Sequence, residues 1–92
     1  MLGRFFPILT GSVSDPKIKR KPVLKHRRII GEAIRRLRTN THLTQEKLGE
    51  LAELNPKYVG EVERGEKIIS IEALLRVAKA VKKPIREFFR DV

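Results

Sequence analysis

The sequence contains no cysteine and no tryptophan, and its aromatic residues are limited to four Phe and one Tyr. The lack of cysteine excludes disulfide bonds and thiolate metal sites, and it is typical of proteins of a reducing, intracellular compartment. Two histidines, His26 and His42, are too few to form a zinc site by themselves. We therefore expect no metal and no cofactor.

Long hydrophobic runs are absent as well. The longest, Phe5 to Leu9, is interrupted by Pro7, and the basic cluster follows it instead of preceding it. Both features differ from a secretory signal peptide. No stretch of 18 apolar residues exists, so we expect no membrane-spanning helix and no membrane partner.

Acidic residues are scarce relative to basic ones. The 92 residues contain 21 Lys and Arg against 11 Asp and Glu, a formal net charge of +10. A chain of this length builds one small core, which disfavours most enzyme folds. Its charge favours a polyanionic partner, either nucleic acid or an anionic membrane face.

The excess charge is concentrated near the N-terminus. Residues 1–30 hold eight basic residues and one acid, a net of +7, whereas residues 31–92 hold thirteen basic and ten acidic residues, a net of +3. Pro16 and Pro22 favour extended backbone at the residues before them. We predict a flexible basic arm over residues 1–27 and a domain over 28–92.

The domain has a helical period and no long alternating stretch, which predicts an all-α fold of five short helices. The first begins at about Arg28. The second starts after Thr44 and runs to about Ala52. The third has Asn55 as its N-cap and Pro56 at its first position, and it ends at Gly65. The fourth follows Ser70 with the apolar face Ile71, Leu74, Leu75, Ala78 and Val81, and Pro84 opens a last short helix with Ile85, Phe88 and Phe89.

The second and third helices fit a helix-turn-helix motif over about residues 45–64. That motif requires apolar residues at fixed offsets and a small residue where the two helices meet. Counted from Gln45, the apolar positions are Leu48, Ala52, Leu54, Val59 and Val62, and the small residue is Gly49. Glu53 stands at the turn, where glycine is the easiest residue because the turn needs a positive φ. An ordinary helical bundle would have to match all six positions by chance.

The segment LTQEKLGELAELNPKYVGEVERG, followed by ISIEALLRVAKAV and PIREFF, resembles the Xre family of prokaryotic and phage regulators. This family contains the lambda-type repressors and Cro proteins. The resemblance covers about residues 29–89. The chain departs from the family pattern at Gly49, where alanine is usual, and at Glu53 and His42, where glycine is frequent.

The resemblance implies a five-helix lambda-repressor-like DNA-binding domain that places residues 56–63 in the major groove of double-stranded DNA. The residues that it assigns to DNA are Thr44, Gln45, Asn55, Pro56, Lys57, Tyr58, Gly60, Glu61, Arg64 and Lys67.

Lys57 is expected to reach guanine or a phosphate, its alternative being a solvated surface lysine. Pro56 either contacts a thymine methyl or only starts the helix. Gly60 allows close approach of the backbone or leaves room for a base. Glu61 either repels phosphates or accepts a hydrogen bond from cytosine.

The remaining assignments concern phosphates and the core. Gln45 opens the second helix, where family members hold a phosphate, and Thr44 can be a cap alone. Tyr58 either donates to a phosphate or finishes the edge of the core. The resemblance also implies that Arg64 and Lys67, just past the third helix, contact phosphates. In this family Glu63 pairs with an arginine of the first helix, here Arg38, and this pair is structural.

The function that these expectations support is a sequence-specific transcription regulator without catalytic activity, acting in the cytoplasm at the nucleoid. We expect a homodimer on a palindromic operator, with part of the C-terminal apolar stripe at the interface. Phage-type repressors, restriction-modification controllers and antitoxins all fit the size. The alternative is an interaction module whose main partner is a protein, such as a toxin; polymerase is a further possible protein partner. The arm has three interpretations: a DNA-binding arm, a protein-binding segment, or an extension without a specific role.

Overall fold

The computed structural model describes residues 16–92, with side chains from residue 25 onward. Within that range the chain forms four α-helices and one 3-10 helix, and no strand. The helices are α2 (Pro16–Asn40), α3 (Gln45–Ala52), α4 (Pro56–Glu63) and α5 (Ile71–Val81), followed by η2 (Ile85–Phe89). The all-α prediction is confirmed, but the expected fifth helix is a short 3-10 segment. Five residues after Pro84 are too few to close more than about one turn of α-helix.

The predicted start of the first helix at about Arg28 is wrong, because α2 begins twelve residues earlier, at Pro16. Proline is tolerated at a first helical position, as at Pro16, whereas Pro22 removes one backbone donor and crowds the carbonyl four residues earlier, a local cost that this helix accommodates. The Lys and Arg residues around it are good helix formers. The rest of the predicted arm, residues 1–15, lies outside the described residues.

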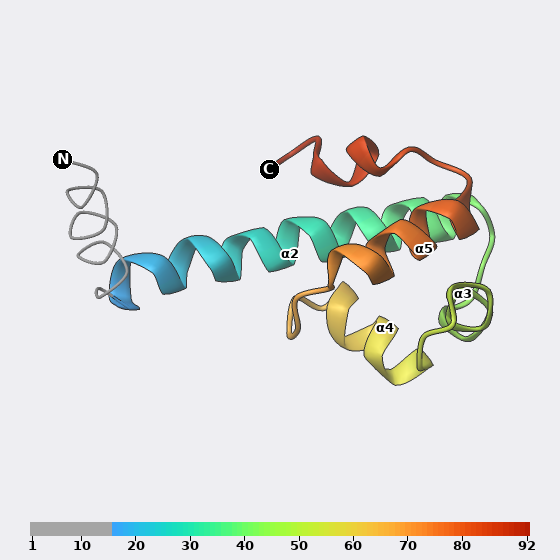
Figure 1. Cartoon of the computed structure of the whole chain (residues 1–92), viewed down its shortest axis with the longest axis horizontal. Helices are drawn as coiled ribbons and strands as arrows, with labels where there is room; N and C mark the ends of the chain where they lie inside the picture. Colours follow the sequence, from blue (N-terminus) through green and yellow to red (C-terminus); the bar gives the residue numbers. More distant parts are fainter. Residues whose placement is uncertain (1–15) are drawn as a thin grey trace, which may run out of the picture.

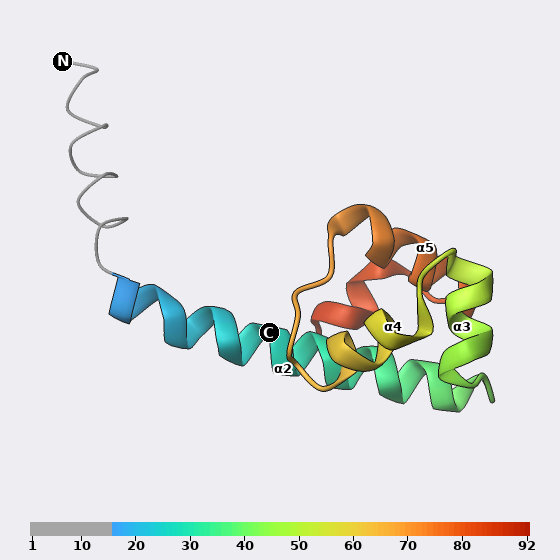
Figure 2. The ribbon, with the colours of Figure 1, turned by 90° about the horizontal axis from the view of Figure 1, so that it is seen from below.

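The other elements gather around the C-terminal half of α2 (Figure 1). In this view η2 lies on one side of α2 and α4 on the other, with α5 in front. The N-terminal half of α2 continues away from this body in both views (Figures 1 and 2). One end of the longest helix is therefore part of the core, and the other end projects from it.

The core confirms the helix-turn-helix pattern. Leu48 and Ala52 are fully buried, Val59 and Val62 are 3% exposed, and Leu54 packs partly buried against them. A Cβ atom at Gly49 would lie 2.5 Å from the carbonyl oxygen of Leu54, so the approach to the turn requires a glycine in this backbone. Glu53 has φ 59°, which is the left-handed conformation predicted for the turn position.

The N-caps predicted for α3 and α4 are both present. The hydroxyl of Thr44 accepts from the backbone N–H of Lys47 at 2.9 Å, and the side-chain oxygen of Asn55 accepts from that of Lys57 at 2.8 Å. Gly65, just after α4, has φ 77°. These contacts fix where α3 and α4 begin and where α4 ends.

The buried face of α5 is displaced from the predicted one, because Ala73 and Val77 are buried in place of Ile71 and Leu75. Leu74, Ala78 and Val81 are buried, but Ile71 is 63% exposed and Leu75 is 50% exposed. Both were expected in the core. Periodicity predicts an apolar stripe, whereas the position of the buried face around the helix depends on the neighbouring elements, here α2, α3 and η2.

Candidate nucleic-acid interface

Four of the residues predicted to contact DNA line one shallow groove between the N-terminal ends of α3 and α4. The groove has a volume of about 450 Å³ and is lined by Arg38, Thr44, Gln45, Glu46, Pro56 and Lys57. The N-terminal ends of two helices border this groove, and the first turn of a helix is a favourable place for phosphate oxygens. The α3–turn–α4 geometry thus brings together residues that are twelve positions apart in sequence.

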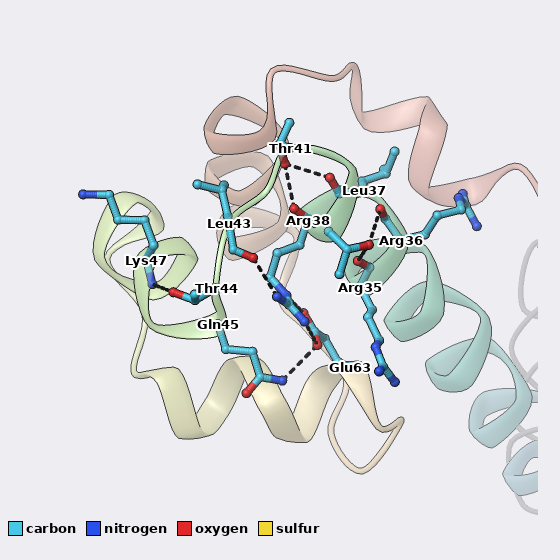
Figure 3. A network of polar contacts seen from close by, with 11 residues as sticks. Arg35, Arg36, Leu37, Arg38, Thr41, Leu43, Thr44, Gln45, Lys47 and Glu63 are labelled. Carbon is cyan, nitrogen blue, oxygen red and sulfur yellow. Dashed lines mark hydrogen bonds and ion pairs between the residues drawn. The ribbon is translucent and has the colours of Figure 1, made fainter.

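A buried ion pair supports the floor of this region (Figure 3). The Arg38 Nε donates to Glu63 Oε2 at 2.6 Å, and Nη2 donates to Oε1 at 3.1 Å. The Glu63 side chain is 2% exposed and that of Arg38 is 11% exposed. The two residues that the resemblance paired are therefore in bidentate contact, and they link α2 to the end of α4.

The same network reaches α3. The Gln45 side-chain amide donates to Glu63 Oε1 at 2.9 Å, and Arg38 Nη1 donates to the carbonyl of Leu43 at 2.7 Å (Figure 3). The Glu63 carboxylate thus accepts three hydrogen bonds, as a buried charge requires. The amide N–H₂ of Gln45, assigned to a phosphate, already has one partner and retains one N–H for another.

Lys57 and Pro56 are exposed at the start of α4. No ion pair involves the Lys57 ammonium group among the described residues, so the charge is free to meet a ligand. Gly60 lies in the next turn and is buried beneath flexible side chains, since a Cβ atom there would meet Arg64 Nη1 at 3.1 Å and Gln45 Oε1 at 3.4 Å.

The other acidic residue of α4, Glu61, is partly neutralised. Glu61 Oε1 lies 3.8 Å from the Nζ of Lys67, and its side chain is 19% exposed. Glu61, for which a cytosine contact was one of two interpretations, and Lys67, assigned to a phosphate, therefore lie together. This pairing reduces the repulsion that a lone carboxylate would exert on phosphates.

Arg64 is paired as well. Its Nε donates to Glu66 Oε2 at 2.8 Å, and both side chains are more than half exposed. The hydrogen bond with Arg64 lowers the pKa of the Glu66 carboxyl below its ordinary value, and the same contact raises the pKa of Arg64. An exposed pair of this kind contributes little to stability and opens readily, so it leaves Arg64 available to a phosphate.

Tyr58 has partners within the domain in this structure. Its ring packs against the core, and its hydroxyl donates to the carbonyl of Ile68 at 3.3 Å. A phosphate contact would require that hydroxyl proton to turn away from Ile68. Thr44 differs, because its hydroxyl accepts at the cap and keeps its own proton as a donor.

Sequence reasoning missed two residues that position this region. A Cβ atom at Gly31 would lie 2.2 Å from the carbonyl oxygen of Val62, so α2 and α4 touch backbone to backbone. Arg27 Nη1 donates to the carbonyl of Glu66 at 3.2 Å. The available signal for Gly31 was its position inside a predicted helix, which can indicate that another helix approaches closely. That signal was used only at Gly49. Arg27 gave no signal because it was placed in the arm.

Two further findings concern the described residues alone. They contain no group of three or more His, Asp or Glu side chains suited to hold a metal ion. None of their helices combines the length and hydropathy needed to cross a bilayer.

Comparison with known proteins gives consistent matches over this region. The helix-turn-helix family HTH_3 matches residues 34–88. The control protein C.SmaI of Serratia marcescens is 38% identical over 53 residues, which are 58% of this chain and 63% of that protein. The chain thus spans somewhat less than two thirds of the length of this curated relative.

Solved structures agree. The restriction-modification controller protein C.AhdI from Aeromonas hydrophila is 40% identical with a TM-score of 0.67, covering 68% of this chain and 96% of that one. The clp gene regulator ClgR from Corynebacterium glutamicum is 31% identical with a TM-score of 0.68, covering 70% of this chain and 68% of that one. The family match covers more than half of the chain, and it includes α3, the turn and α4. The chain therefore belongs to the helix-turn-helix family HTH_3, that of the Xre-like DNA-binding regulators.

Proposed function

We propose that this protein is a sequence-specific transcription regulator that inserts α4 into the major groove of an operator and controls a restriction-modification operon. The observation that carries the DNA-binding part is the shallow groove at the N-terminal ends of α3 and α4. It exposes Lys57 and two helix entrances above a buried ion pair that fixes their relative position. Two of the relatives bear the names of control proteins, which supports the class of operon.

The phosphate contacts in this proposal come from the rim of the groove. Thr44, Gln45 and the backbone N–H groups at the start of α3 hold one phosphate, and Arg64 and Lys67 hold another beyond the end of α4. Such contacts set the position of the domain, whereas Lys57 reads a base edge. Regulation follows from occupation of the operator, which excludes or recruits polymerase.

Selection of bound sequences from random duplex DNA tests this function. We expect enrichment of one consensus with two inverted half-sites whose centres are about 34 Å, or one helical turn, apart. Recovery of no consensus would overturn the proposal and favour the alternative, a module whose main partner is a protein such as a toxin. A consensus present beside the gene of a restriction enzyme would identify the operon.

Lys57→Ala tests the role of the exposed lysine. We expect binding to the selected site to weaken by about 1–3 kcal/mol and the preference at one base pair to relax, because a base-edge contact is lost. The measurement is a fluorescence anisotropy titration against the consensus and against each single-base variant. An equal loss on every duplex would assign Lys57 to a phosphate instead.

We further propose that the protein binds as a homodimer through α5. Ile71 and Leu75 lie one turn apart on its outer face and are at least half exposed, and Leu51 of the neighbouring α3 is 50% exposed. Two antiparallel copies of α5 centred near Leu75 would place Glu72 opposite the partner's Lys79, so charge and apolar surface are self-complementary about a two-fold axis. The C-terminal stripe, which we had expected to contribute, is less suitable because Phe88 is fully buried.

Leu75→Glu is expected to produce a monomer in sedimentation velocity experiments and to reduce operator affinity more than tenfold. A charge at the centre of the interface meets its own copy across the axis, whereas the folded monomer tolerates it because half of this side chain is exposed. Val92→Glu is the matched control, since Val92 is an exposed apolar residue elsewhere, with 56% exposure. A dimer that survives Leu75→Glu would contradict the proposed interface.

A further inference from the structure

The projecting half of α2 carries a concentration of charge that the helix-turn-helix region does not need. Residues 17–28, here called the basic extension, contain the seven cations Lys17, Lys19, Arg20, Lys21, Lys25, Arg27 and Arg28. No acidic residue occurs between Pro16 and Gly31. A third of all Lys and Arg of the chain is thus confined to twelve consecutive residues, which indicates a polyanionic ligand.

The backbone carries this charge away from the body of the domain. The basic extension belongs to the same continuous helix that packs in the core up to Asn40. At a rise of 1.5 Å per residue, twelve residues extend about 18 Å. Both views show this part of α2 continuing away from the body of the domain (Figures 1 and 2).

The point where the extension leaves the domain is the C-terminal end of α4. Arg27 donates to the carbonyl of Glu66 at 3.2 Å, and the Cα of Arg28 lies 3.2 Å from where a Cβ of Gly65 would be. Arg64 and Lys67 belong to the same short segment after α4 and are exposed. The basic extension is therefore continuous with the cations that we assign to the phosphates beyond α4.

We propose that the basic extension binds the sugar-phosphate backbone of duplex DNA flanking the half-site that α4 occupies. This inference rests on the proposed docking of α4 in the major groove. The helix adds contacts to phosphates and none to base edges, so it increases affinity without changing the consensus. Duplex DNA is favoured over an anionic membrane or an acidic protein because the extension begins beside the end of the DNA-reading helix.

The test replaces Lys17, Lys19, Arg20, Lys21 and Lys25 by Gln in the full chain. Glutamine keeps helix propensity while removing charge, and Arg27 is retained because it contacts Glu66. Affinity is measured across a salt series on two duplexes, one trimmed to the consensus and one extended by ten base pairs on each side. Each phosphate contact contributes about 0.9 to the slope of log K against log salt. We expect the variant to lower this slope by about 2–4 on the extended duplex and to change it little on the trimmed one.

A control that removes four charges carries K82Q, K83Q, R86Q and R90Q, just after α5 and in and after η2, and η2 lies on the side of α2 away from α4 (Figure 1). Its slope should change by less than about 1 on both duplexes. An equal fall for both variants would show a net-charge effect and overturn the proposal. An unchanged slope for the extension variant would also overturn the proposal. If that variant instead lost binding to phosphatidylglycerol vesicles, the extension would be assigned to a membrane. If the wild-type protein binds no consensus, the proposed function itself fails, which these measurements distinguish.

Discussion

Arg38→Met is expected to lower the free energy of unfolding by about 3–5 kcal/mol, the largest effect of any single side chain outside the apolar core. The substitution leaves the Glu63 carboxylate, 2% exposed, with the Gln45 amide at 2.9 Å as its remaining side-chain donor. A buried charge with a single neutral donor costs far more than the same charge in a bidentate pair. The Leu43 carbonyl loses its donor as well, so the entrance of α3 is destabilised together with the end of α4.

Urea denaturation followed by circular dichroism measures this loss, with a fixed slope m as the check that folding remains two-state. Lys47→Met is the matched control, because it removes a cation from the pair with Glu50, whose side chains are 55% and 70% exposed. We expect the control to change the unfolding free energy by less than about 0.5 kcal/mol. Similar losses in the two variants would show that burial does not determine the value of the Arg38–Glu63 pair.

The double variant Arg38→Met/Glu63→Leu separates the value of the pair from the cost of an unpaired charge. Replacing both partners by apolar residues removes the desolvation penalty, so most of the lost stability should return. DNA affinity should nevertheless be lower in this variant than in the wild-type protein, because Gln45 loses the acceptor that orients its amide beside the groove. Stability and binding would then respond differently to the same network, as expected if the pair positions the interface.

The helix-turn-helix region could be predicted from the sequence because its signals are local. Asn55 and Pro56 specify where α4 starts through their own backbone geometry, and the spacing from Leu48 to Val62 reflects which side chains must meet across one tight turn. Glu53 was the doubtful position, and the structure gives it the left-handed conformation that glycine would adopt most easily. The apolar contacts on both sides of the turn evidently outweigh the modest cost of a positive φ at a non-glycine residue.

Features that depend on tertiary packing could not be predicted from local signals. Ile71 and Leu75 have the spacing of core residues, and only the arrangement of α3 and α2 around α5 decides that they stay exposed. The start of α2 was misplaced because the preference for extended backbone before Pro16 and Pro22 was taken as decisive. A helix that is already anchored by its packed half extends at a lower cost than one that must nucleate.

The candidate site also has one contact that could be predicted and others that depend on tertiary packing. The resemblance assigned Arg38 to Glu63, and the structure places them in contact. The pairs of Glu61 with Lys67 and of Arg64 with Glu66 were not anticipated, because the first joins α4 to the loop after it and the second lies within that loop, so both depend on how the loop folds. In the proposed complex, DNA must compete with these two carboxylates for the cations that we assign to phosphates.

Gly31→Ala is expected to lower the free energy of unfolding by about 2–3 kcal/mol, although alanine is the better helix former by about 1 kcal/mol. The new Cβ would lie 2.2 Å from the carbonyl oxygen of Val62 and 2.8 Å from that of Glu63. Both obstacles are backbone atoms at the end of α4, so the two helices must separate. That movement would also stretch the ion pair between α2 and α4, and operator affinity should fall with stability.

Gly60→Ala is the matched control, because Gly60 is likewise a buried glycine inside a helix. Its Cβ would meet the Arg64 guanidinium at 3.1 Å and the Gln45 amide at 3.4 Å, and both are ends of flexible side chains that can move by a few tenths of an ångström. The gain in helix propensity should then leave stability unchanged or raise it by up to about 1 kcal/mol. Thermal and urea unfolding of both variants decide between the two glycines. A Gly31→Ala protein as stable as Gly60→Ala would mean that α2 and α4 do not approach backbone to backbone, and that the ion pair alone holds α4 in place.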